Sequence, residues 1–182
     1  MNKVVVLGVT GSIAAYKSPD IVSKLIKLKI DVHTIMTKSA LKLITEQPFL
    51  TLSKNRVVTD LWDIPDWKPE HISLADKADL FLVAPCTANF IGKYASGIAD
   101  DALTTFAFSH YKKVLLAPAM NNMMWLHPAV RNNCKILHER GVKFIGPTAG
   151  NLACGTEGVG KMSDVDDIVK EVVNLLDGIK VK

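Results

Sequence analysis

The sequence has little of two things: long apolar runs near its start, and cysteine. Its first apolar run, at residues 4–7, ends at Gly8 and is far shorter than a signal peptide or a membrane span. Its 3 cysteines are far apart and form no C-x-x-C pair. Dispersed cysteines in odd number, without a signal peptide, are typical of reduced thiols. We therefore expect a cytoplasmic protein with no membrane partner and no disulfide framework.

A concentrated basic surface is also missing. The net charge is only +4, and the lysines are scattered along the chain rather than gathered in a stripe. This distribution argues against nucleic acid as a partner, although a single phosphorylated ligand would suit the sign of the charge. With 48% apolar and 22% charged residues, the composition is that of an ordinary globular protein. We expect residues 1–182 to form one domain with a sizeable core.

Short apolar runs alternate with helical patterns along the whole chain. The runs that are typical of buried strands are residues 4–7, 32–36, 56–59, 80–84, 114–116 and 143–145. Such an alternation predicts a Rossmann-like, three-layer α/β/α fold with a six-stranded parallel sheet. Right-handed crossovers then bring the loops that follow the strands to one edge of the sheet, which is where sheets of this kind bind their ligands.

Polar side chains recur in the loops that should meet at this edge. Gly8 and Gly11 do not make the G-x-G-x-x-G fingerprint, but a glycine turn into a helix still exposes amide N–H groups to an anion. Thr37 and Ser39 are also suited to a phosphate, although Ser39 is equally suited to capping a helix at Ala40. Together these loops favour an active site for a phosphorylated, aromatic ligand.

Three further features carry specific expectations. Pro19 predicts either a kink in the first helix or a second helix start capped by Ser18. An irregular segment rich in Trp and Pro leads to His71, which makes this histidine the most interesting of the 5 in the chain. Residues 147–162 contain several glycines and Cys154. A connection of about sixteen residues predicts a flexible loop with a functional role, and Cys154 is not expected in the core.

The most unusual loop is residues 117–125, which holds two asparagines, three methionines and a tryptophan where Gly, Ser and Asp usually dominate. Asn121 offers both a donor and an acceptor at the sheet edge. The sequence P-A-M-N-N-M-M-W within this loop resembles the P-x-M-N-x-x-M-W motif of the homo-oligomeric flavin-containing cysteine decarboxylases. Residues 11–17, 84–89 and 97–101 resemble the flavin-binding segments of that family, in the expected order.

This resemblance implies a site for FMN along the sheet edge. His71 would be the catalytic base and Cys154 the proton donor, because residues 151–162 resemble the substrate-clamp loop of the members that decarboxylate phosphopantothenoylcysteine. Asn121 would hold the substrate carboxylate, with Lys161 and Met162 also at the substrate. The residues that would contact FMN are Gly11, Ser12, Ile13, Thr37, Ser39, Thr87, Ala88, Asn89, Phe90 and Ala119.

The reaction that the resemblance implies is the decarboxylation of 4'-phosphopantothenoylcysteine to 4'-phosphopantetheine in coenzyme A biosynthesis. A cysteine carboxylate has no electron sink, so the flavin would first oxidise the C–S centre to a thioaldehyde, which delocalises the charge left by CO2. The enethiol would then be reduced again, with Cys154 supplying the proton. Such enzymes assemble as trimers or multiples of trimers, so His71 would act in its own or a neighbour's site. Bifunctional members continue into a ligase domain, and we expect a separate phosphopantothenate-cysteine ligase as partner here.

Other functions also fit this fold. A peptidyl-cysteine decarboxylase of lantibiotic maturation shares the histidine and the P-x-M-N motif, but its product is the enethiol, so Cys154 argues against it. A flavin prenyltransferase should lack the motif altogether, and regulatory binding subunits with this fold typically bear long acidic extensions, which are not seen here. Within the motif, we expect mainly packing roles for Met120, Met123, Met124 and Trp125.

Overall fold

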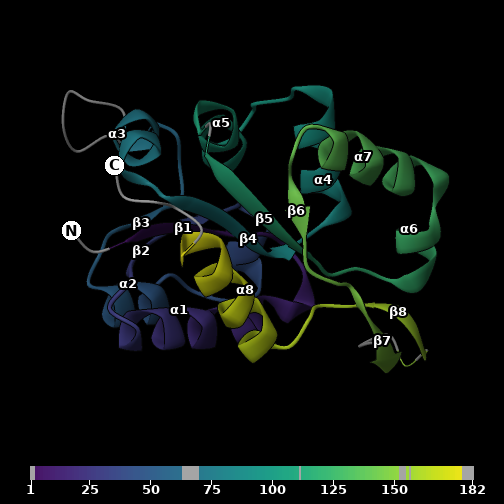
Figure 1. Cartoon of the computed structure of the whole chain (residues 1–182), viewed down its shortest axis with the longest axis horizontal. Helices are drawn as coiled ribbons and strands as arrows, with labels where there is room; N and C mark the ends of the chain where they lie inside the picture. The colour runs from purple at the N-terminus through teal and green to yellow at the C-terminus, as the bar shows by residue number, and fades with distance from the viewer. Residues whose placement is uncertain (1–2, 63–69, 111, 152–154, 156, 178–182) are drawn as a thin grey trace.

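The computed structural model describes residues 3–62, 70–110, 112–151, 155 and 157–177. Its centre is a six-stranded sheet with the order β3-β2-β1-β4-β5-β6, and every neighbouring pair is parallel (Figure 1). The Rossmann-like architecture predicted from the sequence is therefore confirmed. The strands are β1 Val4–Val9, β2 Asp31–Met36, β3 Val57–Val58, β4 Leu80–Cys86, β5 Lys113–Pro118 and β6 Lys143–Phe144.

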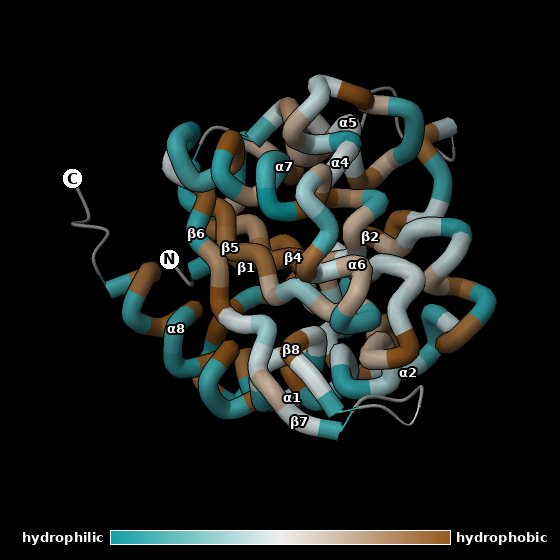
Figure 2. Tube along the Cα trace, turned by 90° about the vertical axis from the view of Figure 1, so that its right-hand side faces the viewer, coloured by the Kyte–Doolittle hydropathy of each residue, from teal (hydrophilic) through white to brown (hydrophobic). Residues whose placement is uncertain are grey.

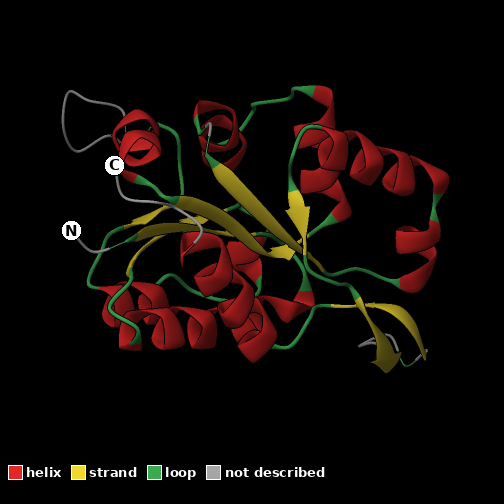
Figure 3. Cartoon of the chain, in the orientation of Figure 1, coloured by secondary structure: helices red, strands yellow, loops and turns green. Residues whose placement is uncertain are grey.

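Helices cover both faces of this sheet, which gives three layers (Figure 3). One face carries α1, α2 and α8, and the other carries α3, α4, α5 and α7 (Figure 1). The helices are η1 Ile13–Lys17, α1 Ser18–Lys27, η2 Ala40–Lys42, α2 Gln47–Ser53, α3 Glu70–Lys77, α4 Ala88–Ser96, α5 Ala102–Ser109, α6 Asn122–Leu126, α7 Pro128–Glu139 and α8 Val165–Asp177, of which η1 and η2 are 3-10 helices. None of the helices in the described ranges is long and apolar enough to cross a membrane.

The core consists of one cluster on each face of the sheet, because successive side chains of a strand point to opposite faces. On β1, Val5 and Leu7 join the cluster under α1 and α8, whereas Val6 joins the cluster under the helices of the other face. On β4, Leu82 and Phe81 divide in the same way. The central strands are thus buried on both sides and read as continuous apolar runs, brown in Figure 2. This packing fixes the strand ends that carry the loops.

The first crossover shows how the chain accommodates Pro19. Helix α1 begins at Ser18, so Pro19 lies in its first turn, where a missing N–H breaks no hydrogen bond. The prediction of a second helix start is therefore confirmed, but Ser18 does not cap the helix. The buried Ser18 hydroxyl instead donates a hydrogen bond of 2.8 Å to the carbonyl of Ala84 at the end of β4.

The glycine-rich segment after β6 differs from the flexible loop predicted for it. Within the described residues, β7 Thr148–Asn151 and β8 Glu157–Lys161 pair as an antiparallel hairpin, separate from the main sheet (Figure 1). Two of its glycines, Gly158 and Gly160, lie in β8. The prediction failed because glycine was taken as a mark of flexibility, whereas these two lie against neighbouring chain segments.

Candidate active site

The carboxyl ends of the strands open into a cavity of about 1110 Å³. Its wall comes from the loops after β1, β2, β3, β4 and β5, from the starts of α4 and α5, and from β8. Ligand pockets usually measure about 300–1,000 Å³, so this cavity has room for a large cofactor together with part of a second molecule. It lies where a doubly wound sheet is expected to bind its ligands.

The cavity brings together most of the residues singled out in the sequence. Asn121, Lys161 and Met162, predicted to contact a substrate, line it. His71 belongs to α3, but its side chain lies outside the described part of the structure, as does the whole of Cys154. The cavity is also lined by all the residues predicted to contact a flavin, which are Gly11, Ser12, Ile13, Thr37, Ser39, Thr87, Ala88, Asn89, Phe90 and Ala119.

The loops after β1 and β2 meet at Gly11. A Cβ atom added there would lie 2.5 Å from Cβ of Ser39 and 3.2 Å from its carbonyl carbon, which is too close for any other residue. Thr37 turns the second loop: its backbone N–H donates to Val9, and its hydroxyl accepts from the N–H of Ala40. Ser39 makes no capping hydrogen bond. The capping role considered for Ser39 therefore belongs to Thr37, and the Ser39 side chain remains at the cavity wall.

Thr10 joins the loop after β1 to the loop after β4. Its hydroxyl donates a hydrogen bond of 2.7 Å to the carbonyl of Pro85 and accepts one of 3.1 Å from the N–H of Thr87. Thr10 is only 2% exposed and lines the cavity. This residue was not predicted from the sequence, although one signal was available. Thr10 carries a hydroxyl directly after a central strand, where it can bond to the end of the neighbouring strand.

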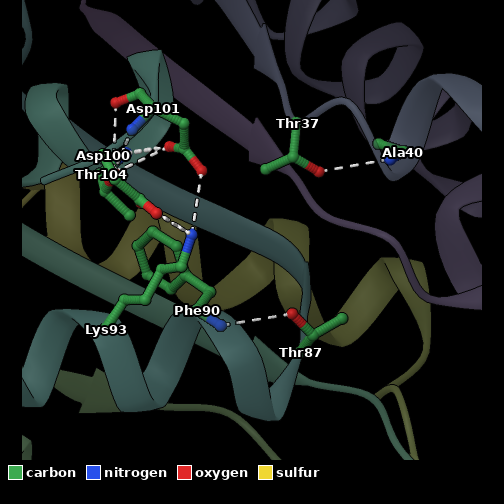
Figure 4. A network of polar contacts seen from close by, with 8 residues as sticks. All are labelled: Thr37, Ala40, Thr87, Phe90, Lys93, Asp100, Asp101 and Thr104. Carbon is green, nitrogen blue, oxygen red and sulfur yellow. Dashed lines mark hydrogen bonds and ion pairs between the residues drawn. The ribbon is translucent and has the colours of Figure 1, made fainter. Parts of the chain in front are cut away.

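Helix α4 begins at the cavity wall. Thr87 is its N-cap, with a hydroxyl that accepts from the N–H of Phe90 (Figure 4). The first-turn residues Ala88 and Asn89 line the cavity. Since the first N–H groups of a helix lack partners within the helix, this end favours an acceptor atom or a negative charge.

Helix α4 also carries a cation, Lys93, that two carboxylates hold in place. Lys93 Nζ donates to both carboxylate oxygens of Asp100, at 2.7 and 2.9 Å, and lies 3.7 Å from Asp101 (Figure 4). The hydrogen bond with Asp100 raises the pKa of Lys93, and the same bond lowers the pKa of Asp100. Asp101 in turn caps α5 through a capping box with Thr104. Lys93 lines the cavity, and the sequence signal that was missed is a helix lysine followed by an acidic pair.

The motif loop after β5 runs along the rim. Backbone hydrogen bonds tie Ala119 to Cys86 and Met120 to Gly160, at 3.0 Å each. Asn121 is the N-cap of α6, because its Oδ1 accepts from the N–H of Met123 at 2.8 Å. This bond orients the Asn121 amide at the cavity wall.

The packing roles expected for the motif residues hold only in part. Trp125 is 8% exposed, with the Arg131 guanidinium 4.9 Å from its ring centre, and Met120 packs against the core. Met123 and Met124 were predicted to pack, but they are 73% and 49% exposed. Helix α6 has only five residues and so buries one side only, which leaves both methionines outward.

Comparison with known proteins shows the family of this chain. A family model described as Flavoprotein matches residues 1–177. The chain belongs to the flavoprotein family. It is 39% identical over 175 residues to the protein of Streptococcus mutans named probable phosphopantothenoylcysteine decarboxylase, and the match covers 94% of this chain and 98% of that one.

Longer relatives also match this flavoprotein. It is 45% identical over 173 residues to the coenzyme A biosynthesis bifunctional protein CoaBC of Borreliella burgdorferi, covering 95% of this chain and 44% of that one. The corresponding protein of Bacillus subtilis is 45% identical over 172 residues, covering 93% and 42%. The chain therefore spans less than half the length of these bifunctional relatives.

Solved structures give the same result. A cysteine-to-serine mutant of PPC decarboxylase, complexed with pantothenoylaminoethenethiol, superposes with a TM-score of 0.88 at 29% identity, covering 97% of this chain and 100% of that one. The FMN-dependent cysteine decarboxylase SpaF gives 0.82 at 29% identity, covering 95% and 97%. The resemblance to the flavin-containing cysteine decarboxylases that was read from the sequence is thus confirmed.

Proposed function

We propose that this flavoprotein uses FMN to decarboxylate 4'-phosphopantothenoylcysteine to 4'-phosphopantetheine, a step in coenzyme A biosynthesis. The observation that carries the proposal is that the cavity at the sheet edge is lined both by the residues expected at FMN and by Asn121, Lys161 and Met162, expected at the substrate. The similarity over nearly the full chain to the Streptococcus mutans protein points the same way.

The residues of the cavity fit FMN. Because Gly11 lies directly against Ser39, the loop after β1 presents backbone rather than a side chain at this part of the cavity wall. The start of α4 offers N–H groups to an acceptor. Ala119 and Phe90, both buried, supply an apolar wall for a flat ring system. Bound FMN would take two electrons from the cysteine C–S centre before CO2 leaves and return them to the enethiol afterwards.

The protein's own contribution is to hold the substrate and to move protons. Asn121, oriented by its hydrogen bond from Met123, would donate from its amide to the carboxylate that is lost. Lys161 supplies a positive charge on the cavity wall for a phosphorylated substrate. His71 would take the proton released in the oxidation, and Cys154 would protonate the enethiol. Proton transfer by a placed side chain contributes roughly 10²–10⁴-fold in rate.

The test measures both the cofactor and the product. We expect the purified protein to be yellow and to convert phosphopantothenoylcysteine to the saturated thiol, identified by mass spectrometry. A colourless preparation that FMN cannot reconstitute would favour a binding subunit without flavin chemistry. A wild-type enzyme that released only the enethiol would favour the peptidyl-cysteine type of decarboxylase.

Two variants separate the proton transfers. His71→Gln should lose CO2 release by roughly 10²–10⁴-fold. Cys154→Ser should still release CO2 but leave the product as the enethiol, in keeping with the PPC decarboxylase mutant that was solved with pantothenoylaminoethenethiol. Cys134→Ser, on α7, is the matched control and should behave as wild type. Normal formation of the saturated thiol by Cys154→Ser would rule out its role as donor.

We further propose that residues 1–182 fold as one domain in the cytoplasm and assemble as a homotrimer or a multiple of trimers. Exposed apolar side chains near the cavity support a partner copy, since Ile13, Tyr16 and Leu126 are each more than half exposed. The bifunctional relatives suggest a separate phosphopantothenate-cysteine ligase as the second partner. Sedimentation of the FMN-loaded protein tests the oligomer.

A further inference from the structure

Hydrogen bonds join the hairpin of β7 and β8 to the motif loop. In the described residues, the N–H of Met120 donates to the carbonyl of Gly160 at 3.0 Å, and the N–H of Val159 donates to Oδ1 of Asn122 at 3.1 Å. The first bond is backbone only, so any residue at position 120 except proline could make it. The second depends on one side chain, that of Asn122.

The two glycines of β8 show how closely the strand lies on this loop. A Cβ atom at Gly160 would collide with the carbonyl oxygen of Met120, and a Cβ atom at Gly158 would lie 2.7 Å from Cγ of Asn122. Neither glycine has a positive φ angle, so backbone conformation is not the reason for glycine here. The reason is close approach, which lets strand and loop touch without an intervening side chain.

The adjacent asparagines of the motif, Asn121 and Asn122, therefore have different structural roles. Asn121 caps α6 and lines the cavity. Asn122 is half-buried, bonds to β8, and is absent from the cavity wall that the described residues form. Asn151 and Lys161, one on each strand of the hairpin, do line the cavity. The Asn122 side chain is thus linked to the cavity wall through its bond to the hairpin.

We propose that Asn122 is a positioning residue, which seats the hairpin on the cavity rim and so sets where Lys161 and Asn151 meet the substrate. The effect on turnover rests on the proposed function, whereas the seating of the hairpin does not. Apart from Ala119, the residues expected at FMN belong to other loops, and Ala119 is tied to Cys86 of β4 rather than to the hairpin. Losing this seat should therefore weaken substrate binding and leave FMN binding unchanged.

The experiment compares Asn122→Ala with Asn122→Asp in the FMN-loaded protein. The alanine variant lacks the acceptor for the Val159 N–H, whereas aspartate keeps an oxygen at the same place and suits the first turn of a helix. A hydrogen bond of this kind contributes about 0.5–1.5 kcal/mol, or roughly 2- to 13-fold. We expect hydrogen exchange of residues 157–161 to rise by roughly that factor in Asn122→Ala, and KM for phosphopantothenoylcysteine to rise by roughly the same factor.

The conservative variant and the controls separate positioning from general destabilisation. Asn122→Asp should keep both the slow exchange and the wild-type KM, and FMN affinity should stay unchanged in both variants. Asn132→Ala, at an exposed position on α7, should change none of these quantities. Gly158→Ala, which forces β8 away from Asn122, should reproduce the raised KM by an independent route.

Two results would overturn the proposal. One is unchanged hydrogen exchange at residues 157–161 in Asn122→Ala, since the hairpin would then not depend on this side chain. The other is a rise in exchange with KM unchanged, since the seat would then not affect the substrate. The exchange measurement needs no substrate, so a wild-type protein without decarboxylase activity would refute the proposed function while the seating of the hairpin was still decided.

Discussion

The two sides of the cavity are built in different ways. On the flavin side, buried hydroxyl groups tie strand ends together: Thr10 bonds to Pro85 and Thr87, and Ser18 bonds to Ala84. On the opposite rim, β7 and α6 are largely exposed, β8 is mostly half-buried, and α6 buries only Trp125. The flavin side is thus held by hydrogen bonds in the interior, whereas the rim is held by hydrogen bonds closer to the surface.

The difference matches what each side must do during turnover. A cofactor that stays bound is best held by a wall that does not move, and removing one partner of a buried hydrogen bond costs about 1–3 kcal/mol because the other partner stays unsatisfied. A substrate must enter and leave, and segments with few buried contacts open at the lowest free energy. We therefore expect substitutions on the flavin side to change folding and FMN binding, and substitutions on the rim to change mainly substrate binding.

The largest effect is expected from Thr10→Val on the flavin side. Valine keeps the shape but leaves the Pro85 carbonyl and the Thr87 N–H without their partner inside the protein. The free energy of unfolding should fall by about 2–4 kcal/mol, measured by urea denaturation of the FMN-loaded protein. Thr10→Ser keeps the hydroxyl and should lose less than half as much. Equal losses in the two variants would show that the methyl group matters more than the hydrogen bonds.

The next effect is on FMN affinity. Gly11→Ala places a methyl group 2.5 Å from Cβ of Ser39, so the loops after β1 and β2 must separate. Overpacking of this kind costs about 1–3 kcal/mol, and we expect FMN to bind roughly 10- to 100-fold more weakly in a fluorescence titration. Gly92→Ala in α4, which would meet only Asn133 at 3.6 Å, is the control and should bind FMN normally. Unchanged affinity in Gly11→Ala would mean that these two loops are free to move apart.

The free energy of unfolding should depend on pH through His110. His110 ends α5, is almost fully buried, and stacks on Phe106. Burial lowers its pKa, so the folded protein holds the neutral ring. As pH falls below about 6.5, the unfolded chain takes up a proton first, and unfolding becomes more favourable by at most about 1.4 kcal/mol per pH unit.

His110→Phe should flatten this dependence between about pH 6.5 and 5, because phenylalanine keeps the ring contacts but cannot bind a proton. The measurement is the free energy of unfolding at each pH for the wild type and the variant. His138→Phe, at an exposed position on α7, should keep the wild-type slope. The same slope in wild type and His110→Phe would show that His110 is not the source of the pH dependence.

The strands of the sheet could be predicted from the sequence because a parallel strand is buried on both faces and is therefore a continuous apolar run. The sequence also identified the loops that reach the cavity, since the position after a strand fixes the edge of the sheet. It could not predict that Thr10 and Ser18 tie these loops together, because such bonds join residues far apart in the chain, 75 positions for Thr10 and Pro85 and 66 for Ser18 and Ala84.

The rim was harder to predict, and for a different reason. Glycines were read as flexibility, but Gly158 and Gly160 allow close contact with residues that are distant in the sequence. The methionines were read as packing, but the short α6 buries only one side. Both errors concern which neighbour a side chain meets, and composition does not carry that information.

The smallest effect is expected at Met124, on the rim. It is 49% exposed and lines the cavity, so Met124→Gln should change the free energy of unfolding by no more than about 0.5 kcal/mol. KM for the substrate should shift modestly, with FMN affinity unchanged. Its neighbour Trp125 is only 8% exposed, so adjacent residues of one motif differ widely in burial. A loss of more than about 1 kcal/mol in Met124→Gln would mean that this side chain is covered in the assembled protein, and the rim would then be as firmly packed as the flavin side.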